Sequence, residues 1–139
     1  MNPKEYREAI RQMLAHENNL VNNRYTWMLA TQSLLFGALG VFWDKDIVVE
    51  LVICSVGLCS TCSVFYALYL ANRSIWNLVK DWESYCESNK DACELPPIYG
   101  LRWEWPQWPC PWLFVPPVVI VAWLVILIRR LPICLFICQ

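Results

Sequence analysis

The stretch IVVELVICSVGLCSTCSVFYALYLA, residues 47–71, contains a single charged residue, Glu50. An apolar run of about 18 residues or more predicts a transmembrane helix, because about 20 helical residues cross a hydrocarbon core about 30 Å thick. Two further apolar blocks, 25–43 and 112–128, lie on either side of it, and most charges lie between the blocks. We therefore predict one all-α membrane domain over residues 1–139, with about three transmembrane helices.

The composition supports a lipid environment. Hydrophobic residues make up 58% of the 139 residues and charged residues 17%, whereas a soluble domain has about 25% charged residues. The formal net charge of −1 argues against a nucleic-acid partner, which calls for a basic face. The first apolar block follows a long charged segment without a signal-peptide cleavage pattern, so we expect it to remain in the mature protein.

The segment 3–24 has apolar residues near the helical period, which predicts an amphipathic helix. Its apolar positions, interrupted by Glu17, are Tyr6, Ile10, Met13, Leu14, Leu20 and Val21. This helix would lie along the membrane surface or pack on other cytoplasmic segments, or it would be a solvated extension of the first span. No helix breaker separates it from the first span, so one long helix is compatible with the sequence.

The first span contains small residues three and four positions apart. The stripe consists of Ala30, Ser33, Gly37 and Gly40. Such a stripe lets a second helix approach closely in a membrane. The candidates for helix packing or pore lining are this stripe together with the polar or small residues Thr31, Gln32, Cys59 and Ser63. The short link 44–46 predicts a tight turn, which makes the first two spans antiparallel neighbours.

Residues 72–111 are the one sizeable polar segment, and we predict a cytoplasmic loop there. Its start, 74–87, has a helical pattern with Ser74 as the expected N-cap. Its end alternates tryptophan with proline, which excludes a regular helix and is typical of a chain at the headgroups. The expected interfacial anchors are Trp103, Trp105, Trp108 and Trp112.

The third span opens with Pro116 and Pro117, which are tolerated in a first helical turn, and Arg129 and Arg130 close it. The tail, residues 129–139, would fold back at the interface or complete a tilted span, with Pro132 as a break. Counting Lys and Arg residues places the N-terminus in the cytoplasm, with the arginine pair as the exception. The expected location is a cell membrane, as a multi-pass protein of the bacterial inner membrane.

The sequence offers little for catalysis. His16 is the one histidine, and no nucleophile, phosphate-loop or paired metal-ligand motif accompanies it, so we predict no enzyme, cofactor or metal. Cys59 and Cys62 are spaced as in Cys-x-x-Cys, but small packing residues inside an apolar helix explain that spacing. Cys134 and Cys138 are candidate palmitoylation sites. Glu50 is the membrane acid, either interfacial or part of a proton relay that would need a partner.

The order of these features resembles that of uncharacterised small multi-pass membrane proteins of bacteria, and the stretch at residues 22–27, NNRYTW, is the most specific part of the likeness. The chain is also similar to small membrane effectors of bacterial anti-phage systems. That resemblance implies oligomerisation and loss of membrane integrity. It assigns no role to any individual residue.

Two functions of different classes follow as hypotheses. The first is a homo-oligomer in which the small-residue stripe packs against other copies and the polar residues line a shared interface or narrow pore. The second is an accessory or scaffold subunit that holds a cytoplasmic protein partner at the membrane through residues 72–111 and the N-terminal helix. A membrane enzyme has the least support.

Overall fold

The computed structural model describes residues 3–43, 45–89, 98 and 111–137, with side chains of the last segment described for 113–130. Regular structure within these residues is entirely helical: α1 (Pro3–Phe42), α2 (Ile47–Ser88) and α4 (Pro111–Ile137). Each of the three contains a stretch long and apolar enough to cross a membrane. The prediction of an all-α chain with three candidate spans is confirmed at this level of length and composition.

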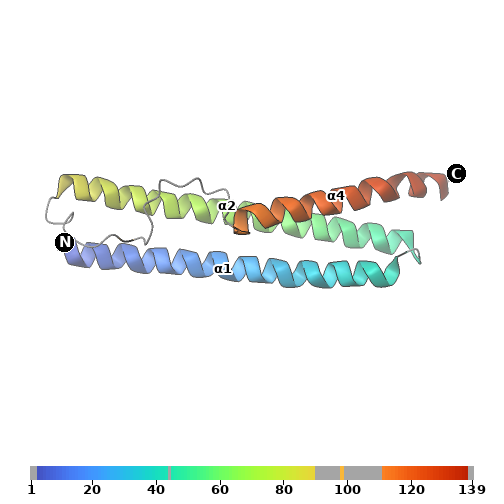
Figure 1. The fold of residues 1–139 in the computed structure, drawn as a ribbon, viewed down its shortest axis with the longest axis horizontal. Coiled ribbons are helices and arrows are strands. Elements are labelled where there is room, and N and C mark those ends of the chain that lie inside the picture. Colours follow the sequence, from blue (N-terminus) through green and yellow to red (C-terminus); the bar gives the residue numbers. More distant parts are fainter. Residues whose placement is uncertain (1–2, 44, 90–97, 99–110, 138–139) are drawn as a thin grey trace.

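The turn between α1 and α2 is tight, as predicted. The backbone N–H of Lys45 donates to the carbonyl of Phe42 at 3.0 Å. Asp46 caps α2, because its carboxylate accepts hydrogen bonds from the backbone N–H groups of Val48 and Val49, two donors that have no partner within the helix. α1 and α2 therefore lie side by side as an antiparallel hairpin (Figure 1).

The hairpin packs along its full length. The buried positions of α2 lie three, four or seven residues apart, and they are Glu50, Cys54, Gly57, Thr61, Leu68, Ala71, Ile75, Val79 and Trp82. This is the heptad spacing of helices that keep one seam against a partner. Three contacts between α1 and α2 show the antiparallel register, each closer to the turn than the one before. Tyr6 contacts Tyr85, Arg24 contacts Ala67, and Gln32 contacts Ser60.

The hairpin is longer than a bilayer is thick. α1 has 40 residues, which corresponds to about 60 Å at about 1.5 Å per residue. The distance along the helix from Arg24 to Trp43 is about 29 Å by the same rise, close to the hydrocarbon thickness of about 30 Å. The other half of the hairpin, which we call the stalk (3–24 of α1 and 72–88 of α2), extends beyond the apolar spans.

The stalk has its own apolar core. Ile10, Leu14 and Val21 of α1 are buried against Ile75 and Trp82 of α2. Residues 3–24 therefore combine two of the alternatives: they continue the first span as one helix, and they pack on another segment, α2.

The expected start of a new helix at Ser74 is wrong, because α2 continues without interruption from the span to Ser88. The seam at Ala71 and Ile75 keeps the same spacing through this point, so packing on α1 sustains the helix where the composition turns polar.

The outer end of the stalk is closed by aromatic rings. Tyr6 lies 4.3 Å from Tyr85 and 6.2 Å from Trp82, measured between ring centroids. Such a pair contributes about 0.5–1.5 kcal/mol beyond area burial. We expect Tyr6→Ala to fray this end and to speed amide exchange of residues 3–14 and 79–88 by about two- to tenfold, measured by hydrogen-exchange mass spectrometry. Met13→Ala removes an exposed side chain as the control, and equal exchange in both variants would contradict the prediction.

α4 starts beside the middle of α2 and runs back toward the α1–α2 turn (Figure 1). Pro116 and Pro117 lie in its second turn, not its first, and Pro116 is fully buried. The predicted break at Pro132 is wrong, because α4 continues to Ile137. A proline removes one backbone donor, and membrane helices tolerate that loss when neighbouring groups satisfy the freed carbonyl. The tail therefore extends the third helix.

Candidate functional site in the membrane-spanning bundle

The bundle of the three candidate spans contains a buried amide near its centre. Gln32 of α1 is 3% exposed. Its Nε2 donates to Ser60 Oγ at 3.0 Å and to the Gly57 carbonyl at 3.4 Å, both on α2. Its Oε1 accepts a hydrogen bond of 2.7 Å from Trp123 Nε1 on α4. One side chain therefore joins all three helices, and the polar atoms of this buried amide all have hydrogen-bond partners.

The indole of Trp123 occupies the space that Gly57 leaves open. Trp123 is fully buried, and its ring stacks on Phe36 with centroids 4.2 Å apart and planes 4° from parallel. A Cβ on Gly57 would lie 2.9 Å from indole Nε1 and closer still to Cε2 and Cζ2. Only glycine permits this approach. The indole of Trp123 and the amide of Gln32 fill the space between the three helices and hold the helices together.

A second polar cluster lies at the turn end of the bundle. Glu50 of α2 is 1% exposed, and its Oε2 lies 3.1 Å from Arg130 Nε on α4. The Arg130 guanidinium also sits 4.0 Å above the ring centre of Trp43 at the end of α1, a cation–π geometry. Glu50 is therefore buried between the helices, and Arg130 is its charged partner. Burial is tolerated because a cation from another helix faces the carboxylate.

The structure separates the predicted packing and pore residues into two groups. Gln32 lies inside the three-helix bundle. The others lie on outward surfaces, and they are Ala30, Thr31, Ser33, Gly37, Gly40, Cys59 and Ser63. The hydroxyls of Ser33 and Ser63 donate to carbonyls of their own helices, Leu29 and Cys59. The small-residue stripe of α1 is therefore not used in packing on α2.

The cysteines of α2 differ in exposure. Cys54 is buried beside Leu39 and Trp123, whereas Cys59 and Cys62 are exposed. Among the described residues, no group of three or more His, Cys, Asp or Glu side chains is arranged to hold a metal ion. His16 is exposed on the stalk. The side chains of Trp103, Trp105, Trp108, Trp112, Cys134 and Cys138 lie outside the described residues.

Sequence reasoning missed two residues that organise this bundle, Trp123 and Arg130. Trp123 is a tryptophan in mid-span, whereas the aromatic preference is for interfaces, and that departure was the available signal. Arg130 ends an apolar block as Glu50 begins one. With three antiparallel spans these two ends fall on the same side, so opposite charges there could have been paired from topology. No protein-family model, curated protein or solved structure matches this chain.

Proposed function

We propose that this chain is a non-catalytic membrane protein that acts by self-association of its spans, as a homo-oligomeric pore or membrane-perturbing effector. The observation that carries the proposal is the outward position of the α1 stripe. A Cβ added at Gly37 or Gly40 meets nothing within 4 Å. Packing within one chain therefore does not require small residues at these positions. Small residues on the outer face of a span favour close approach of a second protomer.

The polar side chains of the outer surface agree with this reading. Thr31, Cys59 and Ser63 face away from the protomer interior, where a second protein surface or water is a better environment than lipid. A pore between protomers would be lined by these residues and not by Gln32. The closed Gln32 and Trp123 contacts keep each protomer a rigid unit that associates as a whole.

Gly37→Leu tests self-association without disturbing the protomer, because the new side chain points into open space. Overpacking an interface costs about 1–3 kcal/mol, so we expect the dissociation constant of the oligomer to rise about 5- to 150-fold. Sedimentation of the purified protein in detergent measures the oligomer, and dye release from liposomes measures permeability. Both should fall together.

The matched control is Val125→Phe, which adds bulk to an exposed position of α4. It should leave the oligomer and the leakage unchanged. A wild-type monomer that releases no dye would reject the proposal. Equal loss in both variants would mean that any added bulk acts and that the α1 stripe is not the contact.

The stalk favours a second function, a scaffold that holds a cytoplasmic protein at the membrane. The observation in its favour is a packed hairpin that extends about 30 Å beyond the apolar spans, because lipid crossing alone does not require it. In this reading a partner co-purifies with the full chain, and deletion of residues 90–110 or charge reversal on the stalk releases it. An unchanged complex in both variants would reject the scaffold.

A further inference from the structure

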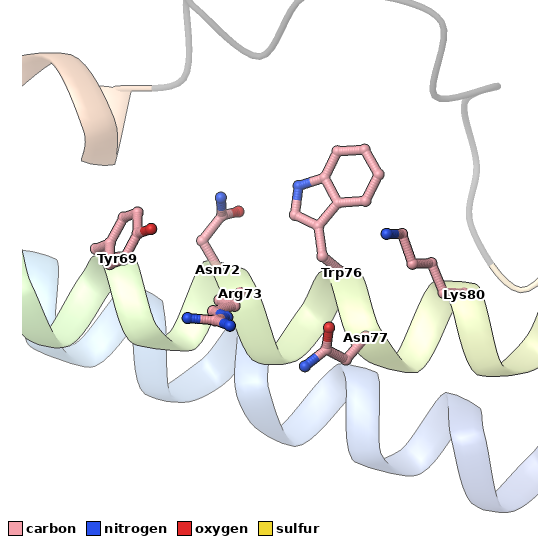
Figure 2. Close-up of a pocket in the computed structure, with 6 residues that line it drawn as sticks. All are labelled: Tyr69, Asn72, Arg73, Trp76, Asn77 and Lys80. Atoms are coloured by element: carbon pink, nitrogen blue, oxygen red, sulfur yellow. The ribbon is translucent and has the colours of Figure 1, made fainter.

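A pocket of about 540 Å³ lies on α2 at the stalk-side end of its apolar stretch. It is lined by Tyr69, Asn72, Arg73, Trp76, Asn77 and Lys80. These positions recur three and four residues apart, which places them on one face of the helix. Figure 2 shows Tyr69, Asn72, Trp76 and Lys80 rising from the side of α2 away from α1.

This face has no part in holding the hairpin together. The residues of α2 that are buried at this level are Leu68, Ala71, Ile75 and Val79, which belong to the seam with α1. Arg73, Asn77 and Lys80 are exposed instead. Packing on α1 therefore does not explain why two cations, Arg73 and Lys80, share the other face.

The lining has the chemistry of an anion site. Arg73 offers a planar fork that matches phosphate, Lys80 adds a second positive charge, and Asn77 supplies an amide donor. Among the described residues that line the pocket, none is acidic; Asp81 and Glu83 follow further along α2.

The position of the pocket indicates where such an anion would come from. Arg24 donates from Nη1 to the Ala67 carbonyl at 3.4 Å, so the charged end of the α1 span meets α2 at this level. The pocket begins two residues further along, at Tyr69. Tyrosine and tryptophan with an apolar body and a polar tip prefer this headgroup level, and the long Lys80 side chain can reach back toward it.

We propose that this pocket binds the phosphate of an anionic phospholipid headgroup from the leaflet on the stalk side. The proposal rests on the membrane placement of the spans and is independent of self-association. A lipid held by Arg73 and Lys80 would fix the depth of α2 in the bilayer and the point at which the stalk emerges.

Native mass spectrometry of the full chain in detergent tests this site. The protein is titrated with phosphatidylglycerol or with phosphatidylcholine of the same acyl chains. We expect one tight phosphatidylglycerol per protomer, and Arg73→Gln/Lys80→Gln should weaken it about 25-fold, about fivefold for each cation removed. Arg11→Gln/Lys45→Gln removes the same charge from exposed positions outside the pocket and should leave binding unchanged.

Three results would overturn the proposal. Equal affinity for both lipids would show that charge is not recognised. Equal weakening in both double variants would reduce the effect to overall charge. Displacement of the lipid by glycerol phosphate at matched concentration would make the ligand a soluble phosphate ester. The same spectra report the oligomer mass, so failure of the lipid site is distinguished from failure of self-association.

Discussion

Replacing Trp123 with alanine is expected to release α4 from the α1–α2 hairpin. Removal of a buried tryptophan costs about 3–5 kcal/mol through lost contacts and the cavity that remains. The substitution also removes the donor to Gln32 Oε1, and leaving a buried acceptor unsatisfied costs about 1–3 kcal/mol more. Since the indole also fills the space above Gly57, no other described contact replaces it at this depth.

Cys54 provides a built-in reporter of this release. It is buried in the cluster that contains Trp123, whereas Cys59 and Cys62 are exposed and serve as internal references. We expect N-ethylmaleimide labelling of Cys54 in Trp123→Ala to rise about 100-fold or more relative to the wild type, as the opening free energy falls by about 3 kcal/mol or more. Peptide mapping by mass spectrometry resolves the three thiols.

Two further variants distinguish the packing of the Trp123 ring from its hydrogen bond to Gln32. Trp123→Phe keeps a ring for Phe36 but lacks the Nε1 donor, so it should cost less than the alanine variant. Gly57→Ala attacks the same contact from the other side, because its Cβ would overlap the indole. If Cys54 stays protected in both Trp123→Ala and Gly57→Ala, the packing of Trp123 on Gly57 does not hold α4 in place.

The second large effect is expected at the turn end of the bundle. Arg130→Met leaves the buried carboxylate of Glu50 without its guanidinium partner and removes the cation above Trp43. Breaking one side of a buried ion pair costs about 3–5 kcal/mol, because the remaining charge stays in a poor solvent. The midpoint of thermal unfolding in detergent, followed by tryptophan fluorescence, should fall clearly below that of the wild type.

The neighbouring arginine is a matched control, because Arg129 is exposed. Arg129→Met removes the same charge one residue away and should leave the midpoint nearly unchanged. The double variant Glu50→Leu/Arg130→Met should recover most of the loss, since replacing a buried pair by apolar residues is often neutral. A similar loss in the Arg129 and Arg130 variants, or no recovery in the double variant, would exclude the ion pair as a specific lock.

Parts of the bundle were predictable because they depend on local composition. The apolar block at 47–71 predicts a span from its length and composition alone. The short link after Trp43 makes the first and second spans antiparallel. The sequence predicts Gln32 as a packing or pore-lining residue, but it does not identify the partners of the amide. Ser60 lies 28 residues away and Trp123 lies 91 residues away along the chain, so no local pattern could identify them.

By itself the sequence determined an all-helical chain with three candidate spans and one tight turn, because burying 20 apolar residues outweighs every local alternative. Tertiary structure decided which face of each helix points inward. It placed Gln32 inside and the α1 stripe outside, joined Glu50 to Arg130, and extended α2 past Ser74 into the stalk. The physical reason is that helix faces in a membrane are chosen by close packing and by polar partners on other helices, not by hydrophobicity, which lipid satisfies equally on every side.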